Sequence, residues 1–313
     1  MSSPRRSAIL SLAASGVLWG LTVPLSKLAL GWLTPAELTF VRFALAGPPL
    51  AFLGRRGLRA AFAPRVLATG AVGFGAVVLL QNSGVARTSV SHAAVIIGVV
   101  PILVALIAAG LRQSRTGVLS WAGYGLALLG IALIAGHAGA GSSESGDALV
   151  LGSAALSALC IALQPRVLEG RDVAAVTAVQ FGAGALVALP VALVQGGRTL
   201  TALPHTAGAP LLAVAALAVV GTLLPFWLFA RGQAHVPAAL AGAFVNLEPL
   251  VGAMVGWLAF GEVAGIPQLA GAVAVLGGVA LSVLPAETWS RVLAEPLRAG
   301  LARLRPVSEG GRS

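Results

Sequence analysis

The sequence predicts an all-α integral membrane protein whose ten transmembrane helices form two inverted five-helix repeats. The first observation is composition, because the 313 residues have a mean hydropathy of +0.94 and only 10% of them are charged. The second is that apolar stretches long enough to cross a bilayer follow one another along almost the whole chain. The third is that the second half of the sequence resembles the first.

Each apolar stretch can cross the hydrocarbon core, which is about 30 Å thick and needs about 20 residues of helix. We expect helices throughout, because a spanning segment must satisfy its backbone polar groups internally. A membrane β-barrel would show short segments of alternating hydrophobicity, and these stretches do not alternate. The predicted spans are residues 7–30, 35–53, 66–85, 90–111, 118–136, 148–168, 173–194, 209–231, 238–260 and 266–284.

The basic residues are distributed unevenly between the two sides of the predicted membrane. With the amino terminus inside, the outside loops hold only Arg87 and Arg198. The positive-inside rule therefore places both termini in the cytoplasm. The net charge of +10 then faces anionic lipid headgroups, so we expect a lipid bilayer as partner and no nucleic acid. The arginines of the inside segments are Arg5, Arg6, Arg55, Arg56, Arg59, Arg65, Arg112, Arg115, Arg166, Arg171, Arg231, Arg291, Arg298, Arg303, Arg305 and Arg312.

The cysteine count and the overall composition indicate the compartment. Cys160 is the only cysteine, which excludes an intrachain disulfide and a cysteine metal cluster. We expect no cofactor and no metal site. The richness in Arg, Ala and Gly suggests a GC-rich bacterial genome and hence a multi-pass protein of the bacterial cytoplasmic (inner) membrane. A homodimer is compatible with the sequence, although nothing in it sets the oligomeric state.

The two halves of the chain align with each other. Residues 86–133 match residues 234–281 without gaps, and upstream Val41-Arg42-Phe43 resembles Val179-Gln180-Phe181. We therefore divide the chain into a first repeat at 7–136, a second at 147–284, and a basic cytoplasmic tail at 285–313. Five spans per repeat force the second copy to enter the membrane upside down, as in many secondary transporters. The matched pairs include Pro101 with Pro249, Ala105 with Ala253, Gly117 with Gly265, Gly123 with Gly271, and Gly130 with Gly278.

The order of the short motifs, doubled, resembles the drug/metabolite transporter superfamily, specifically its ten-helix members with two EamA-type repeats. That resemblance implies export of amino acids, similar metabolites or drugs. The motifs that carry it are Leu18-Trp19-Gly20 with Pro24 and Lys27, then Arg42-Phe43, then Val100-Pro101, and the stretch from Asn246-Leu247-Glu248-Pro249 through Gly261-Glu262.

Glu248 is the acidic residue predicted to lie deepest in the membrane. If its helix starts near Ala238, the carboxylate is about 15 Å deep at 1.5 Å per residue. An ionised carboxylate is costly there, which favours the protonated form unless a cation lies nearby. Glu248 is therefore a candidate for proton coupling and for the substrate cavity. The alternative is structural, with a protonated side chain that hydrogen-bonds across helices.

Four prolines are predicted to break helices within the membrane, and each frees the backbone carbonyl four residues before it. Such a carbonyl is tolerated where it lines a watered cavity. The alternative is that the kinks only shape the packing. These prolines are Pro24, Pro101, Pro225 and Pro249.

A second set of polar residues falls in the outer third of the predicted spans. Lys27 and Arg42 form an outer basic cluster, and Gln81, Asn82 and His92 lie at the same depth. One interpretation is a vestibule that attracts a carboxylate or another anion, with the three uncharged or weakly basic residues in the substrate cavity. The other is that the two basic side chains snorkel toward headgroups.

Trp19 and Asn246 complete the candidate substrate cavity. Trp19 lies mid-span between Gly16 and Gly20, a GxxxG pair that permits close helix approach. Its ring either stacks against a substrate or fills core volume. Asn246 precedes Glu248 by two residues, which on a regular helix points it about 200° away. Both can face one cavity only if the helix is distorted.

These observations predict a secondary transporter that moves small polar metabolites, amino-acid-like or drug-like, by alternating access and in the export direction. We do not expect an enzyme. An intramembrane lipid-modifying enzyme is the first alternative, but the chain has neither an HExxH nor a GxSxG motif. A channel is the second, and nothing in the sequence indicates a selectivity filter or a ring of charges.

Overall fold

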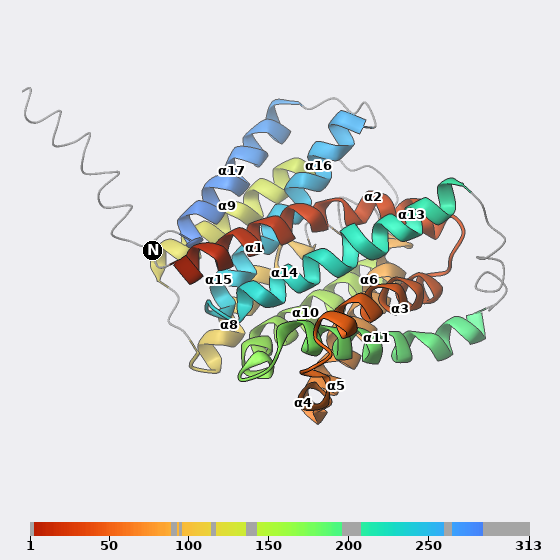
Figure 1. Ribbon diagram of the computed structural model, residues 1–313. Helices are drawn as coiled ribbons and strands as arrows, with labels where there is room; N and C mark the ends of the chain where they lie inside the picture. Colours follow the sequence, from red (N-terminus) through yellow and green to blue (C-terminus); the bar gives the residue numbers. More distant parts are fainter. Residues whose placement is uncertain are drawn as a thin grey trace, which may run out of the picture.

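The computed structural model describes residues 3–88, 93, 96–113, 117–135, 143–195, 208–259 and 265–283, and the regular structure within these ranges is all helical (Figure 1). The prediction of an all-α protein is therefore confirmed. Five helices are long and apolar enough to cross a membrane, at Pro35–Leu53, Pro64–Val85, Glu144–Leu168, Val173–Gln195 and Leu211–Gln233. Shorter apolar helices lie at Val100–Gly110, Val118–Ile134, Ala238–Gly252 and Leu269–Val283. The tail at 285–313 lies outside the described residues.

The first half shows two departures from continuous spanning helices. The predicted span 7–30 consists of α1 and α2, which meet at Leu21, and the span 66–85 contains a π-helical segment, η1. The elements are α1 (Ser3–Gly20), α2 (Thr22–Leu30), α3 (Pro35–Leu53), α4 (Leu58–Ala61), α5 (Pro64–Gly70), η1 (Ala71–Ala76), α6 (Val77–Val85), α8 (Val100–Gly110) and α9 (Val118–Ala135).

The second half has the same kinds of interruption. A π-helical segment, η3, lies at the position that the repeat alignment pairs with η1, and a short 3-10 segment, η4, interrupts the span 238–260. The elements are α10 (Glu144–Leu168), α11 (Val173–Gln195), α13 (Ala209–Ala218), η3 (Val219–Leu223), α14 (Leu224–Gln233), α15 (Ala238–Ala243), η4 (Phe244–Asn246), α16 (Leu247–Ala259) and α17 (Ile266–Val283).

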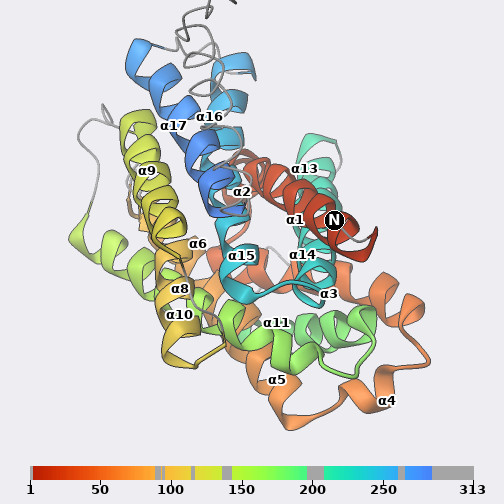
Figure 2. The same ribbon diagram turned by 90° about the vertical axis from the view of Figure 1, so that its left-hand side faces the viewer.

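The glycines of α9 and α17 let these two helices touch along their backbones (Figure 2). A Cβ at Gly123 would lie 2.5 Å from the Gly278 carbonyl oxygen, and one at Gly130 would lie 2.6 Å from that of Gly271. Residue numbers rise along α9 while they fall along α17, so the helices are antiparallel. The Gly-rich predicted spans 118–136 and 266–284 therefore pack against each other.

A second antiparallel pair is formed by α3 and α11, which occupy equivalent places in the two halves. Gly54 packs against the backbone of Ala175, whereas Gly47 lies at the level of Phe181. The rings of Phe43 and Phe181, which match in the repeat alignment, have centroids 5.1 Å apart. Equivalent helices of the two halves therefore run in opposite directions.

The predicted close approach at the GxxxG pair of α1 is confirmed. A Cβ at Gly16 would lie 2.5 Å from the Phe244 carbonyl oxygen, and Gly20 packs against Val251 of α16. This contact brings α1 of the first half against the broken helix of the second half that carries Glu248.

A capping box starts α3 at the turn after α2. The Glu37 backbone N–H donates to Thr34 Oγ1 at 3.2 Å, and the Thr34 N–H donates to Glu37 Oε2 at 2.9 Å. We expect Thr34→Ala to lower the free energy of unfolding by about 1 kcal/mol, because a helix N-terminal donor loses its partner. Thermal unfolding in detergent measures this loss, and Thr34→Ser should retain nearly all of the stability.

Candidate functional site

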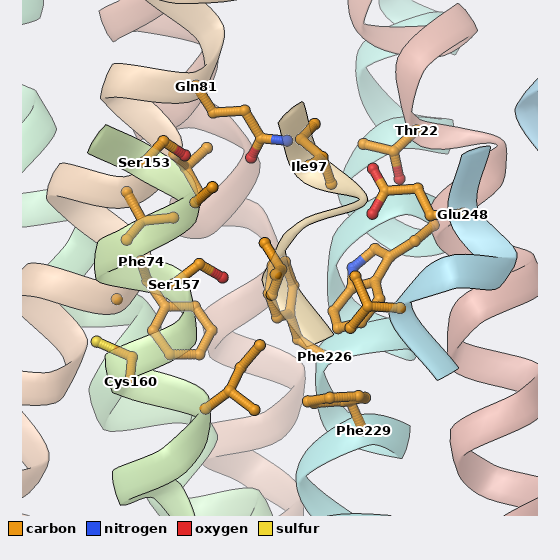
Figure 3. A pocket seen from close by; sticks show the side chains of 18 of the residues that line it. Thr22, Phe74, Gln81, Ile97, Ser153, Ser157, Cys160, Phe226, Phe229 and Glu248 are labelled. Carbon is orange, nitrogen blue, oxygen red and sulfur yellow. The ribbon is translucent and has the colours of Figure 1, made fainter. Parts of the chain in front are cut away.

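A cavity of about 140 Å³ lies between the two halves of the chain (Figure 3). Its walls come from α1, α2, α3, η1, α6 and α8 of the first half, and from α10, α14, η4 and α16 of the second. Along α10 the lining extends from Ser153 to Gln164, which corresponds to about 16 Å at 1.5 Å per residue. The cavity therefore extends along the helices, deep between the two halves.

One wall of the cavity is aromatic and carries Glu248, the one carboxylate among the described lining residues. The Trp19 ring contacts Phe226 and Phe229, with centroids 5.1 and 4.9 Å apart. Glu248 extends from α16 into the same space near Thr22, and no described residue hydrogen-bonds to its carboxylate (Figure 3). The wall thus presents π faces beside a carboxylate that has no hydrogen-bond partner among the described residues.

The opposite wall is lined by small polar side chains. Ser153, Ser157 and Cys160 recur at helical spacing along one face of α10, and Gln81 extends toward the cavity from α6 (Figure 3). Asn82 lies beside Gln81 and donates from Nδ2 to Thr39 Oγ1 at 3.0 Å, so its amide is held by α3. Hydroxyl and amide groups on this wall can donate to or accept from a polar ligand.

Arg42 is buried, with 4% of its surface exposed, and it lines the cavity. Its Nε donates to Thr222 Oγ1 and its Nη2 to the Gly221 carbonyl, both at 2.9 Å. Its charge also interacts with that of Glu248. The interpretation that Arg42 snorkels to headgroups is therefore wrong, because π-helical backbone deep in the bundle binds the guanidinium.

All four predicted helix-breaking prolines lie in the first turn of a helix. Pro24 begins α2, Pro101 begins α8, Pro225 begins α14 and Pro249 begins α16. They start new segments after a turn, a π-helical stretch or a 3-10 stretch, because proline fits the first turn, where its missing N–H is not needed. The helical interruptions therefore lie just before these prolines, and whether the freed carbonyls serve a watered cavity stays a prediction.

The residues four positions before the matched prolines Pro101 and Pro249 lie at the cavity, one in each half. Ile97 and Val245, the residues whose carbonyls these prolines free, both line it. The Gly221 carbonyl, which Pro225 frees, instead accepts hydrogen bonds from Arg42 and, at 3.4 Å, from Thr22 Oγ1.

Other predicted site residues lie elsewhere. Asn246 is 2% exposed, does not line the cavity, and its buried Oδ1 has no partner among the described residues. The 3-10 geometry of η4 turns it into the packing between helices, so its prediction as a cavity residue is wrong. His92 and Glu262 lie outside the described residues, as does the Lys27 side chain.

Sequence reasoning missed the polar face of α10 and the aromatic residues behind Arg42. The serines and Cys160 recur every three or four residues along an otherwise apolar span, and that spacing was a usable signal. The aromatic contacts join residues that are far apart in the chain, so no local sequence pattern predicts them. The rings involved are those of Phe43, Phe74, Phe181 and Phe226.

Comparisons with known proteins identify the family. The model of the EamA-like transporter family matches residues 6–136 and again residues 144–284. The chain belongs to the EamA-like transporter family. It is thus a multi-pass membrane protein of a family of transporters, and its relatives carry the names of transporters and not of enzymes.

Several relatives align with this EamA-family transporter over most of its length. The probable terminal-alkyne amino-acid exporter of Streptantibioticus cattleyicolor is 26% identical over 88% of this chain and 92% of its own. The uncharacterized inner membrane transporter YedA of Escherichia coli is 28% identical over 81% of this chain and 87% of its own. The uncharacterized transporter YdfC of Bacillus subtilis is 24% identical over 73% of this chain and 74% of its own. A solved structure titled "Crystal structure of protein" has the same fold, with a TM-score of 0.78 and 20% sequence identity. The match covers 91% of this chain and 99% of the other.

Proposed function

We propose that this chain is a secondary transporter that exports small polar metabolites by alternating access. The observation that carries the proposal is the cavity between the two halves, whose described lining includes the carboxylate of Glu248 and the guanidinium of Arg42. Many secondary transporters hold their substrate near the midplane, where two repeats meet. Family membership supports transport in general, and the cavity supplies a place for a small molecule.

We propose that ten spanning helices form the two inverted repeats at 7–136 and 147–284, with both termini in the cytoplasm of a bacterium. The antiparallel pairs α9 with α17 and α3 with α11 support the inversion, because each pairs equivalent helices. The excess of arginine in the predicted inside loops supports the orientation.

The substrate that we propose is a small molecule of amino-acid type. Glu248 provides an acceptor for an ammonium group, and Arg42 keeps N–H donors beyond the two used on η3. The aromatic wall can cover a short apolar side chain. One relative is named as an amino-acid exporter, which agrees with this chemistry.

We propose further that Glu248 couples transport to protons. A carboxylate in an apolar wall can bind a proton or an ammonium group but not both, so substrate and proton compete for it. Entry of a proton from outside would then release the substrate there. This exchange uses the proton gradient to drive export.

A two-step experiment tests the proposed function. A thermal-shift screen of purified protein against amino acids, amines and carboxylates first identifies a ligand. Counterflow of that labelled ligand in proteoliposomes then separates a carrier, which exchanges it, from a channel, which does not. Absence of counterflow with every stabilising ligand would exclude the proposal, and ligand-dependent turnover of lipid would favour an enzyme.

The indole N–H of Trp19 leads to a separate prediction about ligand binding. Its Nε1 donor is buried and has no hydrogen-bond partner among the described residues, although its ring lines the cavity. We expect Trp19→Phe to weaken binding of the best ligand about five- to tenfold, because the ring contacts stay and one donor is lost. Titration by thermal shift or calorimetry measures this, and unchanged affinity would assign Trp19 to packing alone.

A further inference from the structure

Two side chains at equivalent places in the repeats each hold the interrupted helix of the opposite half. Arg42 is the eighth residue of α3, and Gln180 is the eighth residue of α11. They match in the repeat alignment. Because α3 and α11 are antiparallel, the two residues are displaced along the helix pair toward opposite ends.

Arg42 of the first half binds η3 of the second half. It donates to Thr222 Oγ1 and to the Gly221 carbonyl at 2.9 Å each. These bonds join α3 to the π-helical segment near the end of the cavity that Gln81 and Asn82 line. π-Helical stretches are frequent where helices must change shape for function.

Gln180 of the second half binds the equivalent region of the first half. Its Nε2 donates at 2.9 Å to Oγ1 of Thr69, which lies in α5 two residues before η1 begins at Ala71. Within its own half it also exchanges two amide hydrogen bonds, at 2.9 and 3.0 Å, with Gln164 of α10, which lines the other end of the cavity. The Gln180 backbone packs directly against Gly70.

We infer that these two contacts are the gates of alternating access, an outer latch of Arg42 on η3 and an inner latch of Gln180 on Thr69. Opening the cavity on either side requires one latch to break while the other holds. Both latches are formed in this structure. The inference rests on the proposed alternating access, and it assigns to Arg42 and Gln180 a role in positioning the two halves.

The latches differ in strength. Hydrogen bonds from a charged guanidinium are roughly twice as strong as those between neutral amides and hydroxyls. The outer latch should therefore hold more firmly, and the unloaded protein should open more often to the cytoplasm. That preference suits an exporter, which loads its substrate from the inside.

The single cysteine of the chain provides the readout. Cys160 lines the cavity, so a membrane-impermeant methanethiosulfonate reagent added from one side modifies it only when that side is open. The same Thr→Val replacement weakens each latch, since it removes the Thr222 acceptor of Arg42 or the Thr69 acceptor of Gln180. Thr177→Val is the matched control, because the Thr177 hydroxyl binds only the Val173 carbonyl of its own helix.

We expect Thr222→Val to raise the ratio of outside to inside modification rates by about fivefold, the effect of losing one hydrogen bond. Thr69→Val should lower that ratio by a similar factor, and Thr177→Val should leave it unchanged. Intact cells and inside-out vesicles supply the two sides. Ser157→Cys combined with Cys160→Ser repeats the measurement from the next turn of α10.

The inference would be overturned if both latch variants shifted the ratio of modification rates in the same direction, or if neither shifted it more than Thr177→Val does. It would also be overturned if the reagent reached the cavity thiol in no variant. Counterflow keeps this result separate from the proposed function. If counterflow is normal and the ratio of modification rates does not change, the assignment of the latches is wrong and the proposed transport function is retained. Opposite shifts without counterflow of any ligand mean that the two sides open as inferred, while the proposed transport fails.

Discussion

Replacing Glu248 by glutamine is expected to abolish substrate-driven proton movement and to weaken binding of the ligand roughly 30-fold or more. The physical reason is that the amide cannot carry the negative charge that an ammonium group or a proton requires. Removing one partner of a buried charge pair costs about 2–5 kcal/mol. Proteoliposomes containing a pH-sensitive dye measure the proton flux when the ligand is added.

The control for Glu248→Gln is Glu144→Gln, the same change at an exposed carboxylate in the first turn of α10. It should leave both proton flux and binding unchanged. Proton flux that persists in Glu248→Gln, with the ligand still transported, would eliminate the coupling role and leave Glu248 a structural residue. Loss of flux in both variants would point to a general loss of folded protein.

Replacing Gly130 by alanine is expected to destabilise the protein by about 2–3 kcal/mol, the cost of overpacking a close contact. The new methyl group would lie 2.6 Å from the Gly271 carbonyl oxygen, and rigid backbone on both sides leaves little room to move. Alanine favours helix over glycine, so local propensity alone predicts the opposite sign. Thermal unfolding in detergent determines which effect is larger.

Gly125→Ala on the same helix is the matched control, because nothing lies within 4 Å of its added Cβ. It should be neutral or stabilise the protein by up to about 1 kcal/mol. A destabilised Gly130→Ala beside an unaffected Gly125→Ala indicates that the contact between α9 and α17 is essential to the fold. Equal effects of the two replacements would contradict the backbone contact.

The sequence predicted the helices well because each lipid-facing span has to be long and apolar by itself, a local property. It also predicted the close helix approach at Gly16 and Gly20, since small residues at helical spacing have few other uses in a membrane. It did not predict the π-helical segments, and the donors that meet the Gly221 carbonyl of η3 come from Thr22 and Arg42, far away in the chain.

The candidate site could be predicted only in part. Glu248 and Trp19 stand out in sequence because of their depth, and both line the cavity. Arg42 was assigned to the outer membrane surface as one of two alternatives, because its partners on η3 are some 180 residues away. Asn246 was misplaced, since its direction depends on the 3-10 turn before Leu247.

The two halves also differ where their sequences have diverged. The second-half residue equivalent to Arg42 is Gln180, so one latch is charged and the other is neutral. The residue of the first half that matches Glu248 is Val100, so the cavity has one acidic wall. The two repeats share one backbone plan but differ in these side chains. We therefore expect the outer and inner latches to differ in strength.

The central claim is that the halves enter the membrane upside down relative to each other. Packing shows which residues of the first helix of each half are equivalent. Gly84 contacts Val150, and its equivalent Gly232 contacts Leu12, so Val150 and Leu12 occupy equivalent places. Seven residues earlier on each helix, Ser143 is therefore the counterpart of Arg5. In Cys160→Ser protein, impermeant thiol labelling of intact cells should reach Ser143→Cys, and should reach Arg5→Cys only after the membrane is opened. Labelling of both positions from the same side would contradict the inverted architecture and everything built on it.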